Sequence, residues 1–313
     1  MKKKVVILGG GNGLSTLIRG IKLFPVDITA VVTVSDDGTS TGRLREEFNI
    51  PAVGDIRRVL VSLSETEPLV EELFNYRFKT TSELNGHTVG NLLLTAVTNI
   101  AGNMSDGIES LGKILNLKGK VLPLTEDNCT LMAEMSDGRI IEGEHNITEA
   151  SGVIKEVFYK EKPVITPETM KAIKEADLIV LSMGSLYTSI IPNLIVKEMI
   201  DQIDSSSAKI MYVCNIMTQP GETDGFKVSD HINTLNKYLG KKKVDTVIVN
   251  NGKITKDIIE KYSVLEQKDP VILDNENIDE NVKIIECDLV DTSTGKISHD
   301  VLKLGFNIFS CTL

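Results

Sequence analysis

The sequence predicts an α/β protein with a mostly parallel, doubly wound sheet, and three observations lead to this fold class. Short β-branched runs alternate with helix-length amphipathic segments, beginning with residues 5–8, 14–23 and 28–34. No Asn-Gly hairpin turn separates the first two strand runs, so we expect those strands to be parallel. A glycine-rich segment joins the first strand to the first helix, in the order that many nucleotide-binding sheets use.

The later segments continue this alternation. Thr166 suits a helix N-cap and Pro167 the first helical position, so a helix is expected to start there. Strands are predicted over 178–182, 210–215 and 244–250, with more strand-like sequence from 271 onward. Helices are predicted over 56–64, 68–77, 88–100, 108–115, 189–203, 230–239 and 301–308.

Residues 121–160 differ in pattern and predict a small antiparallel insertion. Three short strand-like runs, 129–135, 139–144 and 153–159, are joined by turn residues such as Ser136-Asp137-Gly138. We therefore expect residues 1–313 to form a single α/β domain that carries this insertion.

The composition excludes some function classes. The net charge of −10 argues against a general nucleic-acid binder, because attraction to phosphate backbones needs excess Lys and Arg. The four cysteines fit neither a zinc motif nor a disulfide scaffold, and the four apolar residues after the basic start are too few for a signal peptide. No uninterrupted apolar stretch is long enough for a membrane span. We expect a cytoplasmic protein.

The arginines are unevenly placed. Five of the seven lie between Arg43 and Arg77, and none follows Arg139, whereas lysines occur throughout. Arginine presents a planar, permanently charged fork that suits phosphate or carboxylate. This placement predicts one local anion site in an acidic protein.

Gly9–Gly13 follows the first strand and opens the first helix, which favours a phosphate cradle. Glycines let the backbone approach an anion, and the helix start supplies free N–H groups. The dinucleotide fingerprint is incomplete, because Thr16 stands at its third glycine, and the Walker lysine is absent. The loop therefore does not specify a nicotinamide or ATP, and a glycine turn that only packs strand against helix is the alternative.

Two more candidate segments follow the second strand. Asp36 and Asp37 suit contact with a ribose hydroxyl or with Mg²⁺, and a solvated turn is the alternative. In the segment 51–58, Asp55 is predicted to be a helix N-cap. The helix dipole stabilises cations at the C-terminus, so it does not explain Arg57 in this first turn. We therefore expect Arg57 to reach an anion.

Three candidates occur further along the chain. His87 and Asn91 have no acidic or nucleophilic neighbour in sequence, so a structural role is the simpler interpretation. Residues 184–189 repeat the order of strand, glycine loop and helix start, which favours a second anion or sugar site. Residues 215–223 follow the next strand and contain a Pro-Gly turn. A ligand loop and a plain surface turn are nearly equal interpretations of this segment.

Taken together, these segments resemble the signature blocks of the YvcK-type gluconeogenesis factor family, which is related to the CofD-like 2-phospho-L-lactate transferases. The blocks are 9–15, 35–45, 54–57, 86–92, 184–193 and 214–223. The sequence departs from the usual pattern at Asn12, where Thr is usual, at Thr39, where Gly is usual, and at Ser182-Met183, where Gly-Pro is usual.

The resemblance implies a Rossmann-like fold and a cytoplasmic bacterial protein that binds UDP-sugars such as UDP-N-acetylglucosamine. It also implies a role in cell shape and envelope synthesis during growth on gluconeogenic carbon sources, with a homodimer and cell-envelope synthesis proteins as partners. The transferase relatives bind a guanosine diphosphate moiety and a deazaflavin, use Mg²⁺ and transfer a phospholactyl-type group.

Carried over residue by residue, the resemblance predicts a set of site residues. The catalytic candidates are Asp36, Asp37 and His87, of which Asp36 and Asp37 are also the metal candidates. The predicted ligand contacts are Gly10, Gly11, Asn12, Gly13, Leu14, Arg43, Arg57, Asn91, Gly184, Ser185, Tyr187, Thr188, Asn215 and Gln219. The first hypothesis is a UDP-sugar-binding regulatory protein without an assigned reaction, and the second is an Mg²⁺-dependent transferase. The incomplete fingerprint disfavours a third, an NAD-dependent oxidoreductase.

Overall fold

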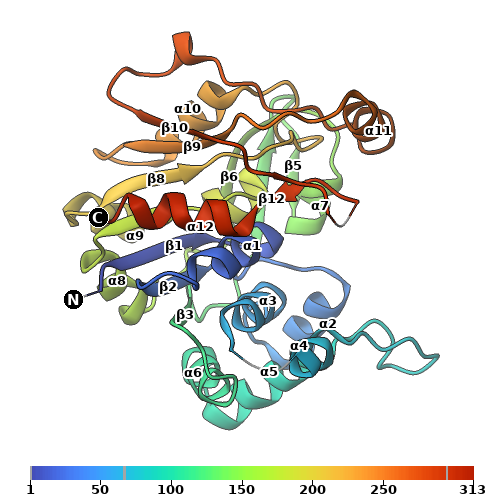
Figure 1. The fold of residues 1–313 in the computed structure, drawn as a ribbon. Helices are drawn as coiled ribbons and strands as arrows, with labels where there is room; N and C mark the ends of the chain where they lie inside the picture. Colours follow the sequence, from blue (N-terminus) through green and yellow to red (C-terminus); the bar gives the residue numbers. More distant parts are fainter. Residues whose placement is uncertain (1, 66–67, 294) are drawn as a thin grey trace.

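The computed structural model describes residues 2–65, 68–293 and 295–313, which contain a seven-stranded parallel sheet (Figure 1). The strand order is β10-β9-β8-β7-β1-β2-β3. The strands are β1 (Lys4–Gly9), β2 (Asp27–Val32), β3 (Lys120–Pro123), β7 (Leu178–Leu181), β8 (Lys209–Val213), β9 (Thr246–Asn250) and β10 (Lys283–Cys287).

The strand order reverses at the centre of this sheet. From β1 the chain adds β2 and β3 on one side, and it then returns to add β7, β8, β9 and β10 on the other. Val5 of β1 therefore pairs with Ile28 of β2 on one side and with Leu178 of β7 on the other, both in parallel. The predicted doubly wound α/β sheet is confirmed, and the carboxyl ends of β1 and β7 form its topological switch point.

Helices cover both faces of the sheet, so its central strands are apolar throughout. Val5 and Ile7 pack on one face and Val6 and Leu8 on the other, all of them at most 2% exposed. The longer helices are α1 (Gly11–Ile21), α2 (Thr39–Phe48), α3 (Gly54–Leu63), α4 (Pro68–Asn75), α5 (Val89–Ala101), α6 (Met104–Ile114), α8 (Pro167–Lys174), α9 (Lys197–Ser205), α10 (Val228–Tyr238), α11 (Lys256–Glu266) and α12 (Val301–Ser310).

The predicted antiparallel insertion is present, with shifted bounds. It consists of β4 (Leu131–Met135), β5 (Ile140–Glu142) and β6 (Ile154–Tyr159), in the order β5-β4-β6. Residues 121–123 were expected at its start but belong to edge strand β3 of the main sheet. The predicted strand over 139–144 ends early, because the short helix α7 (Glu144–Glu149) begins there.

Besides α7, two helices were missed and one was placed wrongly. The polar residues at 39–48 form α2, and 256–266 form α11, although both are weakly amphipathic. The single helix predicted over 189–203 is instead a π-helical turn η1 (Leu186–Ile190), a 3₁₀ turn η2 (Ile191–Asn193) and then α9. Pro192 has no N–H for a continuous helix, and Ser185 caps the first turn in place of Ser189.

The remaining regular elements are short. They are η3 (Asn275–Asn277) and the antiparallel pair β11 (Val290–Asp291) and β12 (Ser298–His299).

No described helix is long and apolar enough to cross a membrane. All four cysteines are free, and Cys129 and Cys214 are buried as small core residues.

Two histidines buried beside β8 make the stability depend on pH. His231 bonds to the Tyr212 hydroxyl at 3.0 Å, and His299 bonds to the Cys214 carbonyl at 3.1 Å. Burial lowers the pKa of each from 6.5 to about 4. Their contribution is therefore complete above pH 6.5, where the unfolded histidine is also neutral, and it is lost as the pH falls toward 4.

Replacing His231 with Gln should make the protein less sensitive to acid. Between about pH 7 and about pH 5, the unfolding free energy of the variant should fall by about 2 kcal/mol less than that of the wild type. Urea unfolding at the two pH values measures this difference. His145→Gln is the control, because His145 is exposed, and an equal response of the two variants would contradict the assignment.

Candidate functional site

The loops that follow β1 and β7 touch each other at the switch point of the sheet. A Cβ atom at Gly13 would lie 1.9 Å from the Met183 carbonyl oxygen, and one at Gly9 would lie 2.0 Å from the Ser182 hydroxyl. Gly11 has a φ of +58°, which other residues rarely adopt. Gly9 and Gly13 are therefore required because a side chain would clash with the neighbouring loop, and Gly11 because of its positive φ.

The first turn of α1 already binds an anionic group, the carboxylate of Asp55 on α3. The Gly11 N–H donates to Asp55 Oδ2 at 2.7 Å, and Arg58 Nη1 contacts Asp55 Oδ1 at 2.6 Å. The prediction that Asp55 is the N-cap of its own helix is wrong, because that position is Val53. Burial, followed by the nearby Asp36, raises the pKa of Asp55 to about 6.

The two aspartates after β2 point to different partners. Asp36 accepts the Gly38 N–H at 2.9 Å and the Thr41 hydroxyl at 3.0 Å, and it lies against Gly54, beside Asp55. Asp37 instead accepts the N–H of His145, in the insertion, at 2.8 Å. Asp36 therefore lies beside Asp55, the carboxylate that bonds to the glycine loop, whereas Asp37 is directed to the insertion.

The pair Asp36 and Asp55 fits Mg²⁺, which takes one or two carboxylates together with ligand phosphates and water. Within the described ranges, no three or more His, Cys, Asp or Glu side chains gather in a metal-binding arrangement. Phosphate oxygens of a ligand would therefore have to complete the coordination. The Mg²⁺ site stays a prediction.

The insertion brings a further carboxyl group, Glu144 of α7, to the same end of the sheet, near Thr188 and Asp36. Its side chain hydrogen-bonds to Thr188 and is partly buried. Burial, followed by the charges of Asp36, Asp55 and Asp37, raises its pKa to about 7. The sequence carries no signal for Glu144, because only folding of the insertion across the crevice places it there.

Asn215, after β8, fixes the loop that follows β7. Its Oδ1 accepts the Gly184 N–H at 2.9 Å and its Nδ2 donates to the Gly184 carbonyl at 2.8 Å. Gly184 has a φ of +138°, a conformation that other residues rarely adopt. The loops after β7 and β8 therefore contact each other, with Asn215 holding the backbone of Gly184.

Glu222 joins the same two loops and was missed from the sequence. Its buried carboxylate accepts the Ser185 hydroxyl at 2.7 and 2.8 Å, the Tyr187 N–H at 3.2 Å and Gln219 Nε2 at 2.7 Å. Burial raises its pKa, although these hydrogen bonds oppose the rise. Ser185 also accepts the Thr188 N–H at 3.0 Å, and its hydroxyl lies 2.6 Å from that of Thr188, so these two predicted residues belong to one network.

His87 and Asn91 meet at the start of α5, where Ser40 of α2 lies between them. Asn91 Nδ2 donates to Ser40 Oγ at 3.1 Å, and Ser40 Oγ lies 3.1 Å from His87 Nδ1 in a second hydrogen bond. Burial, followed by the charges of Arg43 and Arg77, lowers the pKa of His87, so the imidazole is neutral.

The remaining predicted residues occupy varied positions. Asn12 is exposed on the first turn of α1, whereas the side chain of Leu14 is buried in the core and leaves only its backbone for a ligand. Arg43 is exposed and donates to the Asn85 carbonyl at 3.3 Å. Arg57 is buried and donates to Asn75 Oδ1.

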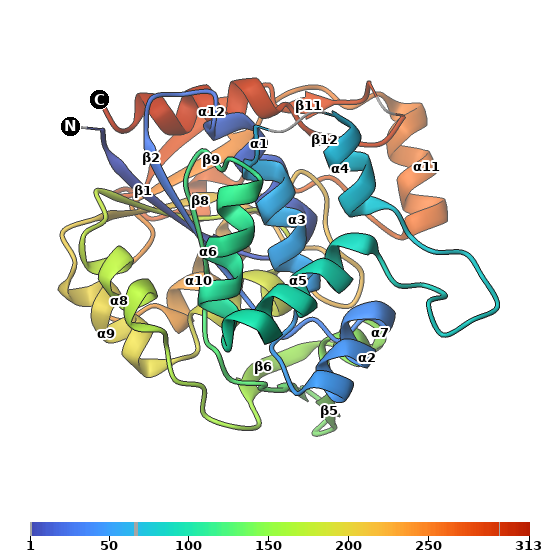
Figure 2. The same cartoon turned by 90° about the horizontal axis from the view of Figure 1, so that it is seen from below.

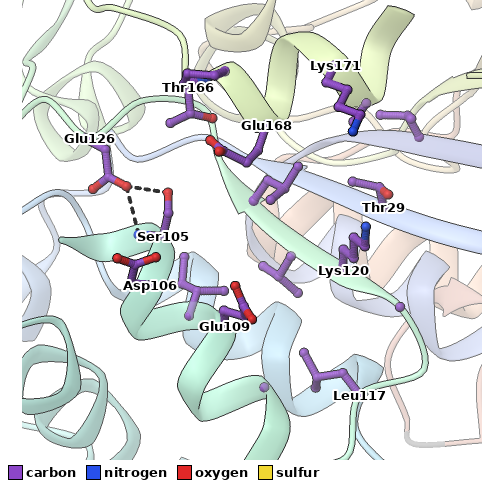
Figure 3. Close-up of a pocket in the computed structure, with 18 of the residues that line it drawn as sticks. Thr29, Ser105, Asp106, Glu109, Leu117, Lys120, Glu126, Thr166, Glu168 and Lys171 are labelled. Atoms are coloured by element: carbon purple, nitrogen blue, oxygen red, sulfur yellow. Dashed lines mark hydrogen bonds between the residues drawn. The ribbon is translucent and has the colours of Figure 1, made fainter. Parts of the chain in front are cut away.

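A groove of about 1210 Å³ lies elsewhere, between α6 and α8 over the amino-terminal half of β1, β2 and β3. Figure 3 shows Glu126 hydrogen-bonded to Ser105 at one side of it, with Lys120 and Lys171 away from this pair. Glu126 also accepts the Met104 N–H at 2.8 Å, so it caps α6. Ligands of open α/β sheets bind at the carboxyl ends of the strands, and the groove is at the other end.

The fold defines a Rossmann-like α/β protein with a glycine loop at the switch point of its sheet. The model of one family, 2-phospho-L-lactate transferase CofD, matches residues 5–290. The chain belongs to this family.

Proteins called gluconeogenesis factors are similar over nearly the whole chain. The one from Bacillus subtilis is 46% identical over 97% of this chain and 96% of its own, and the putative one from Thermotoga maritima is 46% identical over 96% of each. A crystal structure of a UPF0052 family member from Bacillus halodurans superposes with a TM-score of 0.94 at 44% identity, over 98% of this chain and 99% of that one.

Replacing Glu222 with Ala should destabilise the folded protein. The substitution removes the acceptor of the Ser185 hydroxyl, the Tyr187 N–H and the Gln219 amide, and we expect a loss of about 3 kcal/mol. Urea unfolding measures it. Glu222→Gln should lose less, since one acceptor oxygen remains. The exposed Glu149→Ala is the control, and a loss no larger than the control's would contradict the assigned network.

Proposed function

We propose that the protein is a cytoplasmic, nucleotide-sugar-binding regulatory protein that takes UDP-sugars such as UDP-N-acetylglucosamine. The observation that carries the proposal is the N-terminus of α1, which opens directly from a glycine loop at the switch point of the sheet. The Asp55 carboxylate on the Gly11 N–H supports the choice of an anion at this position.

The rest of the crevice suits the sugar and the base. The loops after β7 and β8 offer hydroxyls, backbone groups and amides, held by Asn215 and Glu222. The relatives named gluconeogenesis factors support a role in growth on gluconeogenic carbon sources. We extend this to cell shape and envelope synthesis, with a homodimer and cell-envelope synthesis proteins as partners.

UDP-N-acetylglucosamine should raise the melting temperature, and Asn12→Asp should abolish the rise. A ligand at about a hundred times its Kd stabilises by about 2.7 kcal/mol, which corresponds to about 5 °C in a protein of this size. Asn12 is exposed, so an aspartate there leaves packing intact but repels a diphosphate at the helix start.

Asn12→Gln is the matched control and should keep the shift, because it changes no charge. UDP-glucose and GDP, tested alongside, identify the preferred base and sugar. The proposal fails if no UDP-sugar shifts the melting temperature of the wild type.

A second candidate is an Mg²⁺-dependent transferase, and the adjacency of Asp36 and Asp55 favours it. In such a reaction a phospholactyl-type group passes from a nucleotide diphosphate donor to an acceptor hydroxyl, and nucleoside monophosphate leaves. The two aspartates would hold the metal against the donor's phosphates, where it supplies positive charge.

This candidate predicts Mg²⁺-dependent release of nucleoside monophosphate, which Asp36→Asn should reduce at least about a hundredfold. Chromatography of the nucleotides measures the release. Asp137→Asn is the control, because Asp137 is exposed on the turn of the insertion. A wild type that binds the nucleotide without metal and forms no product would exclude the transferase.

A further inference from the structure

Arg57 carries a buried charge with which no described carboxylate forms a direct ion pair. Asp55 and Asp36 act on it only through their charges, without contact. Its side chain is 5% exposed and donates a hydrogen bond to the neutral amide of Asn75. Its Nε is buried without a partner among the described residues. Burial, followed by the charges of Arg58 and Arg77, lowers its pKa to about 10. A buried charge is costly unless an opposite charge or a full set of hydrogen bonds compensates it.

Two neighbouring arginines are also without a carboxylate. Arg77 donates to the Gly86 carbonyl and Arg43 to the Asn85 carbonyl, and neither forms an ion pair within the described part of the chain. Both carbonyls belong to the segment 76–88, which projects from the body of the molecule between α4 and α5 (Figure 2). By contrast, Arg19, Arg58 and Arg139 each pair with a carboxylate.

The N-terminus of α5 adds to this positive region. A Cβ atom at Gly90 would lie 2.7 Å from Arg57 Cδ, so Arg57 packs directly on the first turn of α5. The N–H groups of Val89 and Asn91 are taken by the Tyr76 carbonyl and by Thr88 Oγ1. The N–H of Gly90 has no such partner among the residues that the structure describes. The helix dipole favours an anion at this end.

His87 contributes a neutral donor at the same place. Its Nδ1 hydrogen-bonds to Ser40 Oγ, and in the tautomer that accepts this bond the ring carries its proton on Nε2. His87 directly precedes Thr88, the N-cap of α5. Charged arginines, a helix N-terminus and an imidazole thus gather in a place where no described carboxylate forms an ion pair with the arginines, although nearby carboxylates act on Arg57 and His87 through their charges.

This place is separate from the glycine loop. Asp55 and Arg57 are two positions apart on α3, and residues at that spacing point in nearly opposite directions. Asp55 faces Gly11 and α1, whereas Arg57 faces Asn75 of α4 and Gly90 of α5. An anion on Arg57 would therefore leave the bond between Asp55 and Gly11 in place.

We propose that Arg57, Arg77, His87 and the first turn of α5 form a second anion subsite, which binds the phosphate or carboxylate group of a small metabolite. The guanidinium of Arg57 gives two parallel hydrogen bonds to such a group, which is the geometry that arginine and oxyanions share. The bound anion supplies the negative charge of an ion pair, which no described carboxylate forms with Arg57.

Arg57→Met tests this subsite with inorganic phosphate and succinate as probes, at ionic strength held constant with sodium chloride. Isothermal titration should show wild-type binding of at least one probe, weakened about tenfold or more in Arg57→Met and several-fold in Arg77→Gln. Stronger binding of phosphate identifies a phosphate-bearing ligand, and stronger binding of succinate a carboxylate. Arg139→Gln, on the insertion, should bind like the wild type.

The melting temperature without anion separates this role from a purely structural one. Removing an uncompensated charge should leave the melting temperature of Arg57→Met equal to or above that of the wild type. Asn12→Asp should bind the probes normally, so failure of UDP-sugar binding and failure of this subsite are distinguishable. The proposal is overturned if neither probe binds the wild type, if Arg57→Met binds them equally well, or if the variant melts lower without anion.

Discussion

The contact between the loops after β1 and β7 is the constraint on which the site depends. Gly9 and Gly13 have no room for a side chain, because Ser182 and the Met183 carbonyl occupy that space. The close approach follows from the strand order, since β1 and β7 are neighbours although residues 10–177 separate them in sequence. It sets the helix start of α1 beside the loop that Asn215 and Glu222 hold, so the crevice is built before any ligand arrives.

The charges around this crevice are separated rather than paired. Asp36, Asp55 and Glu144 lie together at the glycine loop, and burial and mutual repulsion raise the pKa values of Asp55 and Glu144. Arg57 and Arg77 lie across α3, near the start of α5, and neither forms an ion pair with a carboxylate among the described residues. Ion pairs between these carboxylates and these arginines would stabilise both kinds of charge. An arrangement that keeps the two kinds apart therefore favours ligand binding over stability.

Prediction from the sequence succeeded where a local pattern had one structural outcome. The position of Gly9–Gly13 between an apolar run and an amphipathic segment predicts a strand, a glycine loop and a helix. The alternation of such segments predicts the doubly wound sheet. Prediction failed where distant contacts decide. Asp55 looked like a cap of its own helix but caps α1, and the helix expected at 189–203 is broken because Glu222 and Ser185 hold its start in a π-helical turn. Arg45, one of the clustered arginines, ties the Asp36 carbonyl to the Cys129 carbonyl near the start of the insertion.

By itself the sequence determined the α/β class, the place of the glycine loop and the segments that line the crevice, because hydrophobic period and glycine placement are local properties of the chain. Only the tertiary structure decided which charged side chains face each other. Glu144 and Glu222 reach the crevice through the insertion and a turn far along the chain, and Asp55 and Arg57 are assigned to opposite sides by the packing of α3. Electrostatic partners are set by distance in space, which the order of residues does not contain.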